Sequence, residues 1–226
     1  MRILARGEKI RTEELKVKLS SVDIQLTCID DTDLLSTNIA DYDVIFDLNF
    51  DDHPEQLKYL AQAEGKDVFV SAVKVQLAAV LNDLGVYKHR FYGLNAIPTF
   101  INRSLAEVSL NNAADEANLK SIMDRLNWTY QLVEDRVGMI TPRILFMIMN
   151  EACYTVQEGT ASMKDIDISM KLGTNYPMGP FEWADKIGIK DVYESLLAIY
   201  NDTHDERYKI CPLLKTQYLK GELFYS

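Results

Sequence analysis

Short apolar runs alternate with amphipathic stretches along the first half of the chain. The apolar runs are typical of strands, and the stretches between them have the spacing of helices. Because strand and helix alternate, the pattern predicts a parallel sheet with crossover helices. We expect strands at 2–5, 24–29, 44–48, 68–72, 91–94, 106–110 and 130–133, and helices at 12–19, 54–63 and 114–126.

The second half of the chain carries a helical pattern only. Its first helix, at 144–158, is apolar nearly all round, which is typical of a helix buried in a domain core or in a dimer interface. Further helices are expected at 162–173, 180–188, 191–200 and 212–220. We therefore expect an α/β, Rossmann-like domain at 1–135 followed by an all-α domain at 136–226.

Composition and charge narrow the classes of partner. The chain has 226 residues, 47% of them hydrophobic, which is enough for one large core or two modest ones. A formal charge of −10 repels nucleic acids and anionic membranes. We find no signal-peptide pattern and no apolar run of membrane-spanning length, so we expect a soluble, cytoplasmic protein. The three cysteines lie far apart, without metal-ligand spacing to any histidine, and no metal site is expected.

The turn between the first strand and the first helix is where a Rossmann sheet binds a dinucleotide. Such a turn ordinarily reads GxGxxG, so that the backbone approaches the pyrophosphate at a helix N-terminus. Here Gly7 is the only glycine, and each added β-carbon crowds the pyrophosphate. Arg6, Lys9 or Arg11 could attract an anion instead, although basic residues on a loop are usually solvated. Asp30 closes the second strand, where an acidic residue would bind the ribose hydroxyls.

A proline-rich motif opens one of the helices of the second half. The run Tyr176-Pro-Met-Gly-Pro-Phe-Glu182 follows Asp165-Ile-Asp167 and precedes Asp185. Physically, the run suits a rigid turn into a helix, since its prolines fix φ and Gly179 permits a tight bend. In order and spacing these residues resemble the C-terminal domain of the 3-hydroxyacyl-CoA dehydrogenase family. The resemblance is strong over about the last ninety residues and fainter before them.

This resemblance implies an architecture and an activity. In the family the first domain is a Rossmann fold that binds NAD, for which Gly7 and Asp30 stand at the cofactor-binding positions. The helical domain closes the acyl-CoA site and pairs two subunits, so a homodimer is implied. The implied reaction is the NAD-dependent oxidation of 3-hydroxyacyl-CoA in fatty-acid metabolism.

The catalytic positions depart from the family. In the family a histidine after an Arg-Phe-x-Gly-x run is the general base, and a glutamate twelve residues later orients it. After Arg90-Phe-Tyr-Gly-Leu94, these positions hold Asn95 and Glu107. An amide does not titrate near neutrality, so Asn95 cannot serve as general base. Glu107 could act directly, or it could be a solvated or salt-bridged charge.

Three further departures bear on the substrate site. Pro142 stands where the family has an asparagine that helps to hold the substrate carbonyl, and Ser71 is all that remains of a substrate-contacting Asn-Thr-Ser-Ser run. Only about a dozen residues, 31–42, stand where the family inserts a helical hairpin that helps to hold CoA. Each change removes a contact that the family's substrate uses.

Three hypotheses therefore stay open. The chain could be a working NAD-dependent dehydrogenase with an unusual site. It could be an enzyme of the same architecture acting on another small molecule, using Glu107 and either Asp47 or Asp51 at strand ends. It could also be a non-catalytic, dimeric binding or scaffolding homologue.

Overall fold

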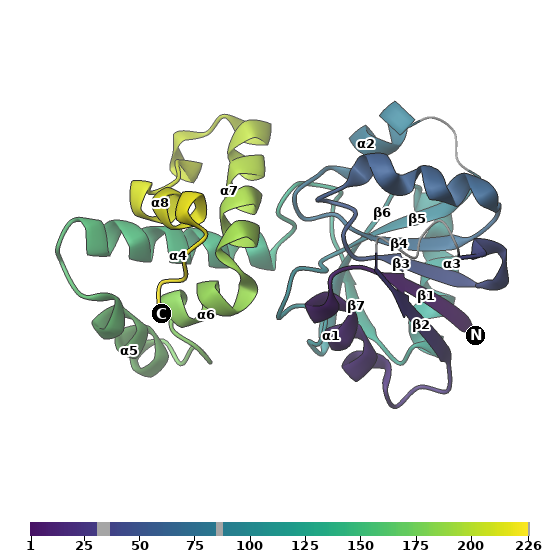
Figure 1. The fold of residues 1–226 in the computed structure, drawn as a ribbon, viewed down its shortest axis with the longest axis horizontal. Coiled ribbons are helices and arrows are strands. Elements are labelled where there is room, and N and C mark those ends of the chain that lie inside the picture. The colour runs from purple at the N-terminus through teal and green to yellow at the C-terminus, as the bar shows by residue number, and fades with distance from the viewer. Residues whose placement is uncertain (31–36, 85–87, 226) are drawn as a thin grey trace. The chain divides into compact units, whose positions relative to one another are not determined.

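The computed structural model describes residues 1–30, 37–84 and 88–225. The chain divides into two compact units, Met1–Met139 and Ile140–Ser226 (Figure 1). The expected change from α/β to all-α near residue 135 thus falls just before the end of the first unit.

Within the described residues, the first unit holds a seven-stranded sheet in the order β2-β1-β3-β4-β5-β6-β7. Every neighbouring pair is parallel except β5 and β6. A parallel crossover needs a dozen or more residues, and the connection 95–104 is too short for one, so β6 returns antiparallel to β5. The predicted parallel sheet thus contains one antiparallel pair, which the sequence pattern did not indicate. The strands are β1 (Arg2–Arg6), β2 (Gln25–Ile29), β3 (Val44–Asp47), β4 (Asp67–Ser71), β5 (Arg90–Leu94), β6 (Leu105–Leu110) and β7 (Thr129–Leu132).

The helices of this unit match the sequence pattern in part. The expected helix at 54–63 is a 3₁₀ helix, and its closing bond, from Ala63 N to the Leu60 carbonyl, spans three residues. The sequence pattern did not reveal α2, whose first N–H groups, from Leu77 and Ala78, donate to the remote Asp135 carboxylate at 2.8 Å. The helices are α1 (Lys9–Leu19), η2 (Ile39–Asp41), η3 (Pro54–Gln62), α2 (Leu77–Leu84), η4 (Ala113–Asp115) and α3 (Glu116–Arg125).

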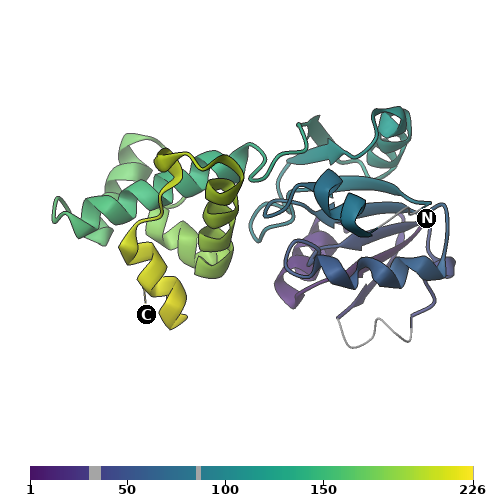
Figure 2. The same cartoon turned by 90° about the horizontal axis from the view of Figure 1, so that it is seen from above.

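The core of the first unit lies on both faces of the sheet, as expected of inner parallel strands. On one face α1 and α3 cover a cluster in which the Phe46 and Phe69 rings stack at 4.8 Å. The alternate residues of the same strands, such as Leu4, Ile45 and Val68, point to the other face of the sheet and are wholly buried as well. The sheet therefore lies between two layers (Figures 1 and 2), and the edge at which open α/β sheets generally bind ligands is the one where the parallel strands end.

In the second unit α4 is the central helix and contacts each of the other four α-helices. Leu145, Phe146 and Met149 of α4 are buried. Pro142 lies in the first turn of α4, where a missing N–H costs no helical hydrogen bond. The helices are α4 (Thr141–Gln157), α5 (Met163–Gly173), α6 (Pro180–Ile187), α7 (Ile189–Thr203), η5 (Glu206–Tyr208) and α8 (Pro212–Lys220).

Candidate functional site

The strand order of the sheet indicates where a ligand crevice is expected, between β1 and β3. From β1 the chain proceeds to β2 on one side and then to β3 on the other, so the order reverses between the carboxyl ends of β1 and β3. Open α/β sheets bind ligands outside such a switch point. Gly7 follows β1 and Asp30 follows β2, and Gly7 N donates to the Ile29 carbonyl at 3.3 Å. The structure thus brings both predicted cofactor-binding residues to this edge.

The turn after β1 is covered by the loop that follows β3. A β-carbon on Gly7 would lie 2.8 Å from Leu48 Cβ and 3.2 Å from Asn49 Oδ1. Leu48 N donates to the Arg6 carbonyl at 2.8 Å, and Glu8 N donates to Asn49 Oδ1 at 3.0 Å. The N–H groups of Gly7 and Glu8 are therefore both bonded to acceptors of the protein itself.

A buried ion pair lies directly beneath this turn. The Arg6 side chain is wholly buried, and its Nη1 lies 2.9 Å from Asp47 Oδ2. The Tyr59 hydroxyl donates to the same Asp47 oxygen at 3.1 Å, and Arg6 also donates to Gln56. Burial raises the pKa of the Asp47 carboxyl, while the Arg6 guanidinium and the Tyr59 hydrogen bond oppose that rise. Burial, with the Asp47 charge, also raises the pKa of Tyr59.

A second set of buried charges lies beside the first. Arg11, in the first turn of α1, reaches Asp51 Oδ1 and Asp52 Oδ2 at 3.4 Å each and donates to the Leu48 carbonyl at 2.5 Å. Lys74 Nζ lies 2.6 Å from Asp52 Oδ1. We call the six residues of the two sets the crevice cluster; it consists of Arg6, Arg11, Lys74, Asp47, Asp51 and Asp52.

The crevice cluster corrects one expectation and adds residues that the sequence did not single out. Basic residues on this turn were expected to be solvated, and that is wrong for Arg6 and Arg11, which are 0% and 1% exposed. Lys9 is exposed, as expected. The sequence did not single out Asp52 and Lys74 as members of buried ion pairs. For Asp52, the only signal was its place among adjacent acidic residues that follow a buried strand.

Asn95 and Glu107 lie side by side. The register of β5 and β6 pairs Leu94 with Val108, so Asn95 comes opposite Glu107, and Asn95 N donates to the Glu107 carbonyl at 3.1 Å. They are buried, at 5% and 7% exposed. Within the described part of the chain, Asn95 Oδ1 has no hydrogen-bond partner. The two positions that the family resemblance singled out are thus neighbours, and their catalytic roles stay a prediction.

Glu107 shares its surroundings with Arg103. Burial lowers the pKa of the Arg103 guanidinium, and the Glu14 and Glu107 carboxylates oppose that shift. Thr99 links the group, since its N–H donates to Glu14 Oε1 at 2.7 Å and its carbonyl accepts from Arg103 Nε at 3.0 Å. Glu107 thus lies near the Arg103 guanidinium.

Ser71 belongs to the crevice rather than to this pair. Its hydroxyl is buried and donates to Asp51 Oδ2 at 2.8 Å, and Val73 N donates to the same oxygen at 3.3 Å. The two strand-end acids considered as alternative catalysts, Asp47 and Asp51, are therefore engaged with groups of the protein.

The proline-rich motif builds the start of α6. Asp167, which is 2% exposed, accepts from Phe181 N at 2.9 Å, from Glu182 N at 3.1 Å and from the Tyr225 hydroxyl at 2.8 Å. A β-carbon on Gly179 would overlap the Asp167 side chain. A carboxylate at a helix N-terminus satisfies N–H groups that have no partner within the helix. The motif therefore has a structural role in the second unit, where it forms the start of α6.

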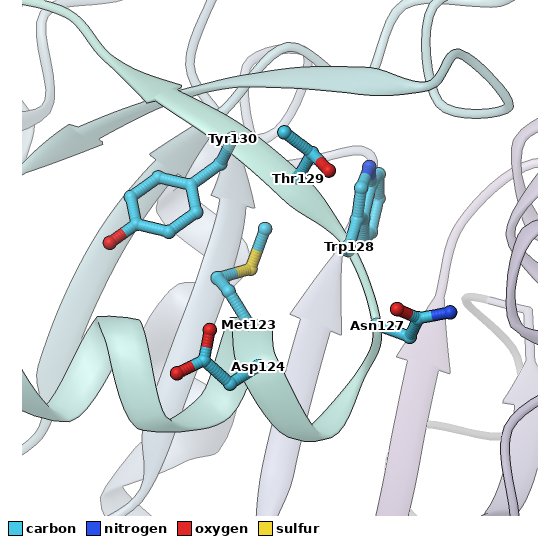
Figure 3. A pocket seen from close by; sticks show the side chains of 6 residues that line it. All are labelled: Met123, Asp124, Asn127, Trp128, Thr129 and Tyr130. Atoms are coloured by element: carbon cyan, nitrogen blue, oxygen red, sulfur yellow. The ribbon is translucent and has the colours of Figure 1, made fainter.

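A separate hollow of about 320 Å³ lies where α3 ends and β7 begins (Figure 3). It contains none of the residues predicted for catalysis or cofactor binding. Its lining residues are Met123, Asp124, Asn127, Trp128, Thr129 and Tyr130. Among residues 1–30, 37–84 and 88–225, no group of histidine, cysteine and acidic side chains is arranged to hold a metal ion. In the same ranges, no helix is both long and apolar enough to cross a membrane.

Comparison with known proteins gives the family. Residues 138–224 match the model of the 3-hydroxyacyl-CoA dehydrogenase C-terminal domain. The chain is 30% identical over 222 residues to a probable 3-hydroxyacyl-CoA dehydrogenase of Caenorhabditis elegans, covering 92% of this chain and 72% of that protein. This chain belongs to the 3-hydroxyacyl-CoA dehydrogenase family. A 3-hydroxybutyryl-CoA dehydrogenase of Bradyrhizobium diazoefficiens is 29% identical over 218 residues, covering 92% of this chain and 71% of that enzyme.

Solved structures of this family share the fold. The (S)-3-hydroxybutyryl-CoA dehydrogenase of Ralstonia eutropha superposes with a TM-score of 0.74 at 19% identity, covering 98% of this chain and 94% of that one. The 3-hydroxybutyryl-CoA dehydrogenase of Escherichia coli gives 0.68 at 15% identity and is covered over 57% of its length. The predicted architecture, a Rossmann-like sheet followed by the family's helical domain, is thus confirmed.

Proposed function

We propose that this chain is a dimeric, non-catalytic binding or scaffolding member of the 3-hydroxyacyl-CoA dehydrogenase family. The family reaction, NAD-dependent oxidation of 3-hydroxyacyl-CoA in fatty-acid metabolism, requires a group that accepts the hydroxyl proton. The observation that carries the proposal is Asn95 beside Glu107, because an amide occupies the position of the family's base. The Asn95 amide cannot accept a proton at neutral pH.

Glu107 does not restore the missing base. In the family the glutamate at this position orients the base and does not itself take the proton, and here Glu107 lies near the Arg103 guanidinium. The chain therefore retains Glu107, which would orient the base, and has Asn95 in place of the base itself.

One observation favours a second candidate, an enzyme of the same fold acting on another small molecule. Asn95 Oδ1 is a buried acceptor without a hydrogen-bond partner in the described part of the chain, and Glu107 lies beside it. Buried polar atoms usually have partners, so a small molecule with a donor group, an acyl-CoA included, would satisfy this one.

The dimer is the second part of the proposal. The apolar residues Leu145, Phe146 and Met149 of α4 are already buried in the single chain, so they do not support an interface between two copies. Support comes from large apolar side chains that remain exposed on the helical unit: Ile144 at 59%, Ile168 at 41% and Leu172 at 83%. Ile168 and Leu172 stand four positions apart on one face of α5, contiguous exposed apolar surface marks contact sites, and the family uses this domain to pair subunits.

We also assign the protein to the cytoplasm. Its cysteines, Cys28, Cys153 and Cys211, are free thiols, and burial raises the pKa of the Cys153 thiol. Free thiols persist in reducing compartments. Recovery of the protein in a periplasmic or membrane fraction would contradict the assignment.

A turnover assay tests the loss of the family reaction. Purified protein is incubated with acetoacetyl-CoA and NADH, beside the Bradyrhizobium 3-hydroxybutyryl-CoA dehydrogenase as a positive control. We expect no oxidation of NADH above the protein-free rate. Steady turnover would refute the proposal.

A thermal-shift screen of small metabolites separates the two candidates. A ligand that binds only the folded state adds about 2.7 kcal/mol at a hundred times its Kd. Stabilisation by a metabolite that Glu107→Gln abolishes, together with chemical conversion of that metabolite by the wild type, would favour the second candidate. An unchanged melting temperature with every compound favours the scaffold.

A further inference from the structure

The switch point between β1 and β3 is where a Rossmann sheet holds the pyrophosphate of a dinucleotide, on N–H groups at the start of the first helix. In this chain Gly7 N and Glu8 N already donate to Ile29 O and Asn49 Oδ1. Leu48 lies within contact distance of the position that a Gly7 β-carbon would take. The backbone donors that would bind the pyrophosphate are thus engaged, and a loop of the protein covers them.

The charged side chains at the same place pair with one another. The crevice cluster contains three cationic and three acidic side chains, and in the four ion pairs given above both partners are at most 7% exposed. Asp52 links two separate elements, because its carboxylate lies 3.4 Å from Arg11 Nη2 on α1 and 2.6 Å from Lys74 Nζ after β4. An anionic ligand at the switch point would make contacts of the same kind with these two cations.

We propose that the crevice cluster replaces the dinucleotide: Asp51 and Asp52 supply the negative charge that Arg11 and Lys74 would otherwise take from a bound pyrophosphate. The crevice is closed to NAD. This inference does not depend on the missing base, since it concerns a different set of residues from Asn95 and Glu107.

The physical reason is the cost of displacement. A pyrophosphate would have to displace the carboxylates from Arg11 and Lys74 and break the Glu8–Asn49 hydrogen bond. The displaced carboxylates would then be buried without partners, next to an anion of the same sign. Binding at this position is therefore opposed by both desolvation and repulsion.

Thermal unfolding of two proteins tests the inference. For the wild type, NADH and inorganic pyrophosphate at millimolar concentration should leave the melting temperature unchanged. Asp52→Asn keeps the size of the side chain and removes its charge, so Arg11 and Lys74 lose a partner. We expect its melting temperature to fall by on the order of 10 °C and to recover in pyrophosphate more than in sodium chloride of equal ionic strength.

Matched variants keep the test specific. Asp124→Asn removes the same charge from an exposed pair with Lys120, whose partners are 64% and 66% exposed, and should change neither the melting temperature nor its response to pyrophosphate. Lys74→Met removes a cation of the cluster and should lose stability without recovery in pyrophosphate.

Two results would overturn the inference. One is stabilisation of the wild type by NADH, which requires no variant. The other is an Asp52→Asn protein that is as stable as the wild type and indifferent to pyrophosphate. NADH binding without turnover would contradict the closed crevice and would leave the proposed loss of catalysis unaffected. Turnover would contradict both the closed crevice and the loss of catalysis.

Discussion

Gly7 has a different task here from the one that glycine has in a dinucleotide-binding turn. There a missing side chain lets a phosphate approach the backbone. Here it lets Leu48 and Asn49 approach, since a β-carbon would meet them at 2.8 and 3.2 Å. One residue type thus serves either a ligand or a neighbouring loop, and only the structure distinguishes the two.

Restoring the base should not restore the reaction. Asn95→His returns an imidazole beside Glu107, but the closed crevice still excludes the hydride acceptor, so we expect no turnover of acetoacetyl-CoA with NADH. Asn95→Gln, another amide, is the matched control. Turnover by the histidine variant alone would show that the missing base was the only defect and that the crevice admits NADH.

His89 gives the first unit a pH-dependent stability. Lys66 N donates to its Nδ1 at 3.2 Å, so the neutral ring carries its proton on Nε2, which lies 3.1 Å from the Leu60 carbonyl. Burial lowers the pKa of His89. The folded state therefore binds fewer protons than the unfolded state, and stability falls as the pH drops from about 6.5 toward the lowered pKa.

Denaturant unfolding between about pH 5 and pH 7 measures this contribution. His89→Gln should flatten the dependence of the unfolding free energy on pH across this window. His53→Gln is the control, because the His53 side chain is 47% exposed. An unchanged slope in the His89 variant would contradict the assignment.

At the scale of elements, the start of α6 depends on one carboxylate. Asp167→Ala leaves the N–H groups of Phe181 and Glu182 and the Tyr225 hydroxyl without their acceptor. We expect the unfolding free energy to fall by about 2–4 kcal/mol, measured by chemical denaturation.

Lys171→Met is the matched control for that helix start. It breaks a partly exposed ion pair with Glu182, whose atoms lie 2.7 Å apart, and should cost no more than about 1 kcal/mol. If Asp167→Ala and Lys171→Met lowered the unfolding free energy by the same amount, the hydrogen bonds that Asp167 accepts would not account for the stability of the start of α6.

Elements that are determined by neighbouring residues in the sequence could be predicted from it. Elements that depend on residues far along the chain could not. The seven strands and the five α-helices of the second unit follow hydrophobic periodicity and capping residues. The start of α2 depends on Asp135, which is 58 positions from Leu77. The antiparallel return of β6 depends on connection length rather than on the pattern of the strand itself.

The same reasoning separates the two parts of the candidate site. Asn95 and Glu107 are neighbours because one short connection joins their strands, and the family resemblance had singled out both positions. Arg6 and Asp47 are 41 positions apart, and nothing in the sequence near Arg6 indicated that it would be buried. The family resemblance located the crevice, but only the packing of the loop after β3 showed what fills it.

For the whole molecule, the exposed apolar side chains of the helical unit should hold two copies together. Leu172→Glu places a charge at a position that is 83% exposed, so it should leave the fold intact and weaken the dimer. Val17→Glu, at 57% exposed on α1, is the control.

Sedimentation at micromolar concentration measures this directly. We expect wild type and control at twice 25.8 kDa and the Leu172 variant nearer 25.8 kDa. A wild-type monomer would refute the dimer without affecting the crevice.

The central claim is that the protein's own charges occupy the place of the dinucleotide. Its most direct test is a titration of the wild-type protein with NADH, followed by nicotinamide fluorescence, with the Bradyrhizobium 3-hydroxybutyryl-CoA dehydrogenase in parallel. The closed crevice predicts no saturable change for this protein up to millimolar NADH. Saturable binding at micromolar NADH would contradict it.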